Sequence, residues 1–494
     1  MSAGTPDWRT TLWLATTGGR SDRVRTALTA VGAAAAVLAL LAAATVAAAG
    51  PEDGPYTSAV LNEVGLHVGV VIALVLLCVP VLAFTGQCSR IGAPARDHRL
   101  AAFRLSGATP ADVVRVAAAE TGAAAGLGAL LGLGGYLLGR VLLDEPVTTS
   151  FVRYTVEVVD GSENLSRERV TGPALRLPVD VLPAPWLVAL IVVAVPLLAA
   201  LVAVTAMRRV RTTPFGVVRL AVQRPVRVLP AVLFVGGTVA MASFGAMLRA
   251  TGLDESQGGV QTVVFLVLLL ATAAGLVLGT AALSAGAGHL LARRAGRPSL
   301  LLAGRRLVAA PFQASRAGAA LLVVVLVAAG AQAFGALVSL MAADDVLGTT
   351  AEALAAVDLA LVVAGVVAAV AVVVGAVEGL LSRRRSTAAL VAAGVPRGVL
   401  GRALLLEVLL PVVPAAALAT AAGALATRGV FGTSLESGRV DADGVASIVR
   451  QAVPVPWSGL AVVLAAAVLG VALLALLTLP LLRRTTDPAE LAAT

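Results

Sequence analysis

Residues that could do chemistry are scarce in this chain, and most lie near the ends of long apolar runs. The glutamates Glu120, Glu378 and Glu407 fall near the predicted inner ends of such runs. A proton-coupled carrier needs acids deep in the membrane, where an ionisable group is a functional candidate by default. These carboxylates are shallow, so we expect Glu120 and Glu407 to pair with arginines at the inner surface. Their partners stay open, because Arg115 and Arg402 precede them by five residues, which is not a helical pairing distance.

The residue types argue against catalysis by this chain. We find no nucleophile–base set, metal-ligand cluster or nucleotide-binding fingerprint, so no catalytic residue, metal ligand or bound cofactor is predicted. Cys78 and Cys88 lie ten residues apart on one predicted helix, about 15 Å, and cannot form a disulfide with each other. All 37 basic residues are arginine. A Walker-type phosphate loop requires a lysine, so any ATP and Mg²⁺ that drive this protein must be bound by a separate ATPase.

Composition places the chain among multi-pass membrane proteins. Of its 494 residues 59% are hydrophobic, and the mean hydropathy is +0.94. Such values favour an all-α membrane helix bundle over a soluble globule. Ten stretches are near the length of about 20 residues that crosses a bilayer. We place these spans at 28–49, 62–86, 113–139, 184–207, 228–249, 259–286, 317–342, 355–380, 403–427 and 456–482.

Charge indicates how this bundle is oriented. With the N-terminus inside, the inner segments hold 28 arginines and 9 acids, and the outer segments hold 9 arginines and 19 acids. This asymmetry obeys the positive-inside rule and predicts that both termini are cytoplasmic. Because the arginines alternate with acidic loops, the pI of about 11.0 does not point to a nucleic-acid partner. We expect a multi-pass protein of a bacterial plasma membrane, surrounded by the lipid bilayer.

One stretch of sequence occurs twice. Gly107 and Gly394 lie 287 residues apart, and each is followed 8 residues later by an arginine and 13 residues later by a glutamate. Three residue types recurring at one offset indicate an internal duplication. Each glycine suits the left-handed position past a helix C-terminus. Pro110 and Pro396 suit the first turn of a following helix, with Thr109 as N-cap in the first copy. Each copy is therefore predicted to be a short cytoplasmic helix that turns sharply into a span.

The ten spans group as four, two and four, and the outer loops are small. The predicted organisation is an amphipathic segment at 1–27, a first repeat at 28–207, a linker with two spans and interfacial helices at 208–316, a second repeat at 317–482 and a tail at 483–494. Two outer loops are longer, at 143–183 and 428–455, and each follows the third span of its repeat. Partial alternation at 151–159 suggests a strand in the first of them.

The third span is rich in glycines that lie four residues apart, a spacing that lets helices approach closely. The predicted helix-packing residues are Gly122, Gly126, Gly128, Gly132, Gly135 and Gly139. Two interpretations stay open. The glycines serve ordinary packing within the bundle, or they make this helix line the interface between the two repeats.

These features resemble the FtsX-like permease domain of the MacB/LolC/FtsX group of ABC transporters. The resemblance rests on the arginine-rich run 383–385, the stretch 389–396 with Leu390 and Gly394, and Arg402 and Glu407 leading into a span; the first copy keeps Phe103, Gly107, Arg115 and Glu120. It covers about 62–207 and 355–482. It implies four spans per unit, two units per transporter, and ATPase subunits docked beneath. This chain lacks the large extracytoplasmic domains that MacB-like and bacitracin-resistance-type members carry between spans.

The resemblance implies a permease that is not itself an enzyme. Two copies of a cytoplasmic ABC ATPase would drive it, and it would move or export a substrate by transmitting motion. The lack of charged cavities and large soluble domains favours a hydrophobic or lipid-like substrate. The coupling helices are expected at 97–106 and 384–393. The residues predicted to contact the ATPase are Arg99, Leu100, Phe103, Arg104 and Gly107 in the first copy, and Arg384, Arg385, Thr387, Leu390 and Gly394 in the second.

Two further classes stay open. A regulatory membrane protein of the FtsX type would pass ATPase motion to an extracellular or signalling partner through the same coupling helices. A secondary transporter would need broken helices and polar sites near the middle of the membrane. Pro411 and Pro414 offer such a break in the ninth span.

Overall fold

The structure, a computed structural model, divides the chain into two units. It describes residues 20–49, 55–57, 59–62, 70–71, 74–75, 81, 107–159, 162–207, 229–251, 258–341, 349–440 and 446–485. Unit 1 comprises Met1–Gln223 and Val346–Val367, and unit 2 comprises Arg224–Asp345 and Ala368–Thr494. The two spans of the predicted linker therefore belong to the same unit as the second repeat.

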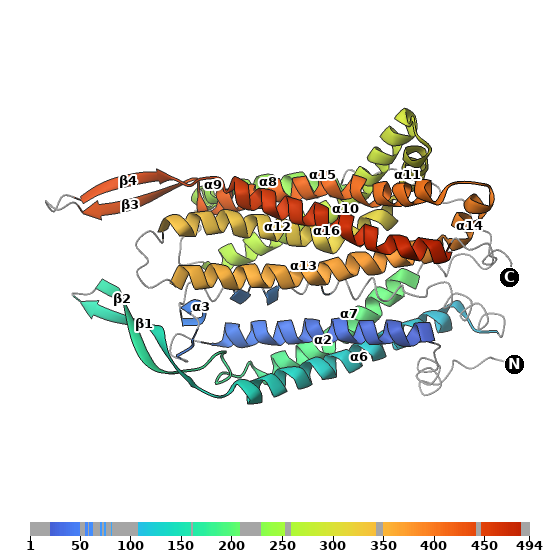
Figure 1. The fold of residues 1–494 in the computed structure, drawn as a ribbon. Coiled ribbons are helices and arrows are strands. Elements are labelled where there is room, and N and C mark those ends of the chain that lie inside the picture. The colour runs from blue at the N-terminus through green and yellow to red at the C-terminus, as the bar shows by residue number, and fades with distance from the viewer. Residues whose placement is uncertain are drawn as a thin grey trace. The chain divides into compact units, whose positions relative to one another are not determined.

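The described part of unit 1 contains long helices, a short helix and a β-hairpin (Figure 1). Its elements are α2 (Arg20–Ala48), α3 (Ala59–Asn62), α6 (Pro110–Leu143), β1 (Val147–Val159), β2 (Ser162–Ala174) and α7 (Pro185–Met207). The first half of α13 (Thr349–Ser382) is also assigned to this unit.

Unit 2 holds the remaining elements, again with one hairpin before its last helix. They are α8 (Leu229–Ala242), α9 (Phe244–Thr251), α10 (Gly258–Arg294), α11 (Pro298–Ala309), α12 (Pro311–Met341), the second half of α13, α14 (Arg384–Ala392), α15 (Arg397–Phe431), β3 (Ser434–Val440), β4 (Ala446–Ala452) and α16 (Trp457–Thr485).

Membrane character is confirmed by eight helices that are long and apolar enough to span a bilayer within the described residues. They correspond to eight of the ten predicted spans. The predicted span 228–249 is divided into the shorter helices α8 and α9. The predicted span 62–86 lies mostly outside the described residues. The ten-span, four–two–four arrangement therefore stays a prediction.

In unit 1, α2 and α6 pack closely because two glycines of α6 present bare backbone to α2. A Cβ at Gly128 would overlap the Ala30 carbonyl, and one at Gly132 would lie 2.6 Å from the Ala34 oxygen. The contact buries an apolar cluster of α2, α6 and α7 side chains, among them Leu41. These two glycines therefore serve packing inside their own unit.

The other glycines of the α6 series have different surroundings. A Cβ at Gly122 would contact Ala200 of α7 at 3.4 Å, and one at Gly135 would contact Leu38 at 3.6 Å. Gly126 and Gly139 have open space beside them. The four-residue spacing thus identified two close backbone contacts among six candidates.

Unit 2 has close packing of the same kind between α12 and α15. A Cβ at Gly423 would overlap the Leu326 carbonyl and would lie 3.0 Å from the Gly330 nitrogen. α15 continues as one helix through Pro411 and Pro414. The break that a secondary transporter would need in this span is therefore absent.

A β-hairpin joins α6 to α7 in unit 1 and α15 to α16 in unit 2, and each projects beyond the helix ends of its unit (Figure 1). The strand expected at 151–159 is confirmed as part of β1, which pairs with β2 over thirteen residues. The second hairpin, β3–β4, was not predicted. The described residues are otherwise mostly helical, which is consistent with the predicted all-α membrane bundle. Arg140 and Arg428 sit in the last turns of α6 and α15 and donate to the carbonyls of Val181 and Val453, at 2.6 and 3.1 Å.

Candidate functional site

The turn before α15 has the predicted glycine geometry. Gly394 has a φ of +89° and follows the last residues of α14. The Val395 amide donates to the Leu390 carbonyl at 3.0 Å, and the Gly394 amide donates to the Val391 carbonyl at 2.9 Å. This pair of bonds is a Schellman motif, and Val395 and Leu390 both pack against the cluster of Leu380 and Leu400. The helix therefore stops at a defined residue, and the next helix starts at a fixed angle.

The first copy shares the positive φ of this glycine. Gly107 has a φ of +98°. Thr109 is the N-cap of α6 and forms a capping box with Asp112, as the sequence predicted for the cap. In the second copy the assignment of Pro396 was one residue off, because Pro396 is itself the N-cap and Arg397 begins α15. Counted from its glycine, each helix nevertheless starts three residues later.

α14 is the expected second coupling helix, but two of its predicted contact residues face inward. Thr387 is buried, and its hydroxyl donates to the Arg383 carbonyl at 2.9 Å. Leu390 packs beside Leu380 and Leu400 in the apolar core of unit 2. Ser386 and Ala389 are exposed instead. Thr387 and Leu390 therefore hold α14 against its own unit, and the exposed side chains of this helix that the structure describes are small.

Part of the predicted coupling set cannot be located. Arg99, Leu100, Phe103 and Arg104 lie outside the described residues, as does the helix expected at 97–106. The side chains of Arg384 and Arg385 are also outside the described set, although the backbone of both residues belongs to α14. The coupling role of these residues stays a prediction.

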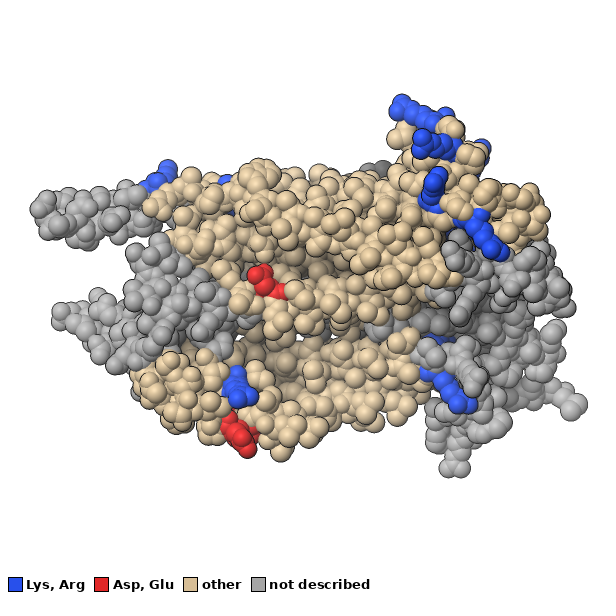
Figure 2. Space-filling view, in the orientation of Figure 1, with Lys and Arg blue, Asp and Glu red and all other residues tan. Residues whose placement is uncertain are grey.

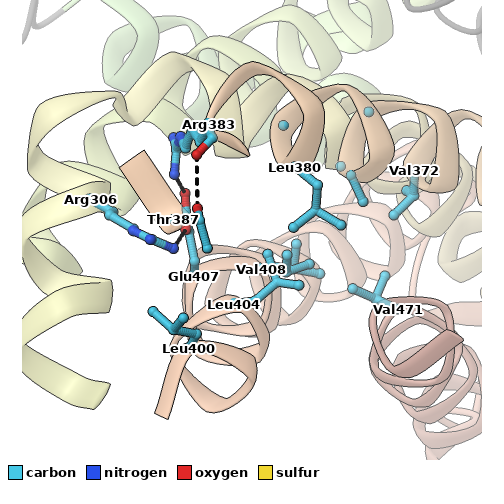
Figure 3. Close-up of a pocket in the computed structure, with 15 residues that line it drawn as sticks. Arg306, Val372, Leu380, Arg383, Thr387, Leu400, Leu404, Glu407, Val408 and Val471 are labelled. Atoms are coloured by element: carbon cyan, nitrogen blue, oxygen red, sulfur yellow. Dashed lines mark hydrogen bonds and ion pairs between the residues drawn. The ribbon is translucent and has the colours of Figure 1, made fainter. Parts of the chain in front are cut away.

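Glu407 lies near the start of α15 and pairs with arginines from α11 and from the junction of α13 and α14 (Figure 3). Arg383, between α13 and α14, donates to Glu407 Oε1 at 2.5 Å. Arg306 of α11 places a guanidinium nitrogen 3.8 Å from Oε2, which is an ion pair too long for a hydrogen bond. Glu407 is 7% exposed. The carboxylate therefore connects the start of α14, α11 and α15 through charge.

Glu120 makes the corresponding pair in unit 1. Arg25, near the start of α2, donates to Glu120 Oε1, and both side chains are almost fully buried. Pairing of Glu120 and Glu407 with arginines is thus confirmed. Neither partner is the arginine considered from the sequence: Arg115 contacts Asp112 at 3.7 Å, and Arg402 is exposed. Arg25 lies 95 residues before its glutamate, and no local spacing could have indicated it.

A cavity of about 60 Å³ lies beside Glu407 in unit 2. Figure 3 shows Arg306, Arg383, Thr387 and Glu407 together at one side, with apolar side chains continuing away from them. The apolar wall comes from α13, α15 and α16 and includes Leu380, Val408 and Val471. Within the described residues, Glu407 Oε2 is buried without a hydrogen-bond partner. Burial lowers the pKa of Arg306 from its ordinary value, and the Glu407 carboxylate opposes this shift.

Metal chemistry finds no support in the part of the chain that the structure describes, where no group of three or more potential ligands gathers. The arrangement provides a connection between two helices and a buried ion pair that links them. A short helix ends at a glycine, restarts as a long apolar helix, and is tied to that helix by a buried carboxylate. No protein-family model, curated protein or solved structure matches this chain.

Proposed function

We propose that this chain is the transmembrane permease subunit of an ABC transporter, driven by a separate ATPase. The observation that carries the proposal is the repeated turn at Gly107 and Gly394, each followed 13 residues later by a buried, arginine-paired glutamate. A device of this kind suits the transfer of force from a cytoplasmic partner to a membrane helix. Two of them in one chain fit the two subunits of an ATPase dimer. Resemblance to FtsX-like permeases in the residues around both turns supports the same proposal.

Force would pass through α14 into α15. α14 ends in a Schellman turn at Gly394, and Arg383 at its start binds Glu407 of α15. Displacement of α14 would therefore move α15 at two points, the covalent turn and the ion pair. α15 is continuous for 35 residues, a rise of about 52 Å, and leads to the β3–β4 hairpin. The proposed mechanism moves a hydrophobic or lipid-like substrate by transmitting this motion.

The test uses the exposed surface of α14. The chain is co-expressed with each ABC-type ATPase of its own genome, and complexes are examined for two ATPase subunits per chain and for stimulated hydrolysis. Ala389→Asp places a charge on the exposed surface of α14, where it should weaken ATPase binding without disturbing the core. Ala309→Asp, at an exposed position of α11, is the matched control and should leave binding unchanged.

Two results would contradict the proposal. One is the absence of any two-to-one complex with these ATPases. The other is equal binding by the Ala389→Asp and Ala309→Asp proteins, which would remove α14 from the contact. Leu390→Asp is unsuitable for this test, because Leu390 belongs to the core of unit 2 and a buried charge would unfold it.

A second candidate function, regulation of an extracellular partner, is favoured by the two hairpins. A two-stranded hairpin leaves backbone donors and acceptors unpaired along its outer edges, and partners can bind by adding a strand there. Shortening the loop between β1 and β2 separates the candidates. It should leave substrate movement intact in a transporter and abolish the partner's response in a regulator.

A further inference from the structure

The junction of α10 and α11 carries exposed arginines that the proposed function does not use. Arg293 and Arg294 lie in the last turn of α10, Arg297 is the N-cap of α11, and Arg305 lies further along α11. All four are exposed. We call this part of unit 2, residues 288–309, the basic elbow.

The two helices of the basic elbow are held together by a close backbone contact. A Cβ at Gly288 would lie 2.8 Å from the Gly304 carbonyl oxygen, and one at Gly304 would lie 2.9 Å from the Gly288 oxygen. Ser299, Ala303 and Leu307 are buried on the same side of α11 as Gly304. The basic elbow therefore presents its arginines from a packed helix pair.

The exposed side of the basic elbow combines basic and apolar residues. Pro298, Leu301, Arg305 and Ala309 are exposed and follow one another at helical spacing along α11. Leu301 is 43% exposed, and Leu290, near the end of α10, is 51% exposed. A bilayer surface accepts both kinds of side chain, because headgroups attract the arginines and the acyl boundary takes up the leucines.

Helix length brings the basic elbow to the level of the headgroups. The apolar part of α10 runs from Val263 to Arg294 and has 32 residues, which is a rise of about 48 Å. A bilayer with its headgroups is about 40–45 Å thick, so the last turn of α10 reaches the headgroup layer. The next candidate span begins at Gly318 in α12. The basic elbow thus connects the ends of two apolar spans.

The charge of this stretch has one sign. No acidic residue occurs in the sequence between Glu255 and Asp344. Figure 2 shows basic side chains grouped at this part of unit 2, beside a broad apolar surface. Basic residues at a membrane edge are attracted to anionic lipids.

We propose that the basic elbow binds the anionic phospholipid surface of the inner leaflet, with its arginines among the headgroups and its exposed leucines at the edge of the acyl chains. α11 also carries Arg306, whose guanidinium lies 3.8 Å from the Glu407 carboxylate of α15. The helix that contacts the lipid surface is therefore also ion-paired to α15. The proposal concerns this chain alone and does not require the ATPase.

The test measures how deeply the basic elbow lies in bilayers of different charge. A nitroxide is attached at Gly296→Cys in full-length protein that lacks Cys78 and Cys88. Gly296 is exposed, lies in the turn between the two helices, and has open space for a side chain. The protein is reconstituted in nanodiscs of phosphatidylcholine alone or of phosphatidylcholine mixed with phosphatidylglycerol. Collisions of the nitroxide with oxygen, which concentrates in the bilayer, and with a neutral water-soluble nickel complex report its depth.

The nitroxide should lie deeper in the anionic bilayer. It should collide more with oxygen and less with the nickel complex than in phosphatidylcholine alone. High salt should reduce this change in the unaltered elbow, because salt screens exposed charges. Arg297→Gln/Arg305→Gln should lose most of the change, since each arginine near an anionic surface contributes about a fivefold preference for it.

Two controls separate the basic elbow from general effects of charge and lipid. Arg397→Gln/Arg402→Gln removes the same charge from exposed positions of α15 and should leave the Gly296 nitroxide unaffected. A nitroxide at Ser386→Cys, on the exposed surface of α14, should report the same depth in both bilayers. Size-exclusion profiles check that each variant is folded.

Three results would overturn the proposal. They are equal depth of the Gly296 nitroxide in both bilayers, an equal change at Ser386, and equal behaviour of the two double variants. A basic elbow that bound an acidic surface of the ATPase instead would show no dependence on lipid, and Arg297→Gln/Arg305→Gln would lose ATPase binding. Absence of any ATPase complex would contradict the proposed function and leave the lipid contact standing.

Discussion

Glu120 and Glu407 lie 287 residues apart, and each is buried and paired with an arginine from elsewhere in its own unit. Each also follows, by 13 residues, a glycine with positive φ. The same two-part arrangement thus occurs at the start of α6 and at the start of α15. In each unit it ties the beginning of one long helix to a neighbouring element.

The buried pair of unit 1 should be essential to stability. Arg25→Met removes the guanidinium that pairs with Glu120. It should lower the free energy of unfolding by about 3–5 kcal/mol, because the Glu120 carboxylate stays buried without this partner. The double variant Arg25→Met/Glu120→Leu should recover most of this loss. Arg23→Met, at an exposed position two residues earlier, serves as control and should change stability little. Thermal unfolding in detergent measures all four proteins, and equal melting temperatures for Arg25→Met and Arg23→Met would contradict the prediction.

Close packing of α2 and α6 predicts different outcomes for neighbouring glycines. Gly128→Leu would drive a side chain into the Ala30 backbone. It should lower the free energy of unfolding by at least about 1–3 kcal/mol, the usual effect of overpacking a core. Gly126→Leu, two residues earlier and facing open space, should be tolerated. The measurement is the yield and thermal stability of monodisperse protein. Similar behaviour of the two variants would mean that α2 and α6 do not approach closely at Gly128.

The turn at Gly394 predicts a backbone effect separate from any contact. Gly394→Ala has open space around it but forces a Cβ into the left-handed region, at a cost of about 1–2 kcal/mol. Gly398→Ala lies in the first turn of α15 with open space and no positive φ, so it should be neutral or stabilise by up to about 1 kcal/mol. Thermal unfolding distinguishes them, and a tolerated Gly394→Ala would show that the turn is not constrained.

The orientation of the chain is testable with exposed positions in a variant that lacks Cys78 and Cys88. Cysteines at Ser150 in β1 and Ser434 in β3 should react with an impermeant maleimide in intact cells. A cysteine at Ser386 in α14 should react only after the membrane is opened. All three positions are exposed, so a lack of reaction cannot be ascribed to burial. Labelling of the Ser386 position from outside would reverse the predicted topology.

Local features of this protein could be predicted from its sequence. Apolar length identified eight spanning helices, because crossing a bilayer depends on composition within one segment. The positive φ of Gly107 and Gly394 and the cap at Thr109 followed from residues within one turn. Alternation also identified part of β1. Each of these features is decided by neighbours along the chain, so the sequence suffices for them.

Features that depend on which helices meet required the tertiary structure. Membrane helices are apolar on every side, so their pattern does not reveal which face is buried. Sequence spacing could not separate Gly128, which contacts α2, from Gly126, which does not. Sequence spacing also did not indicate that Thr387 and Leu390 face inward. It did not indicate that Arg25 pairs with Glu120 or that Arg306 pairs with Glu407. The composition determined that this is a multi-span membrane protein, and the packing of distant helices decided where its buried charges and its cavity lie.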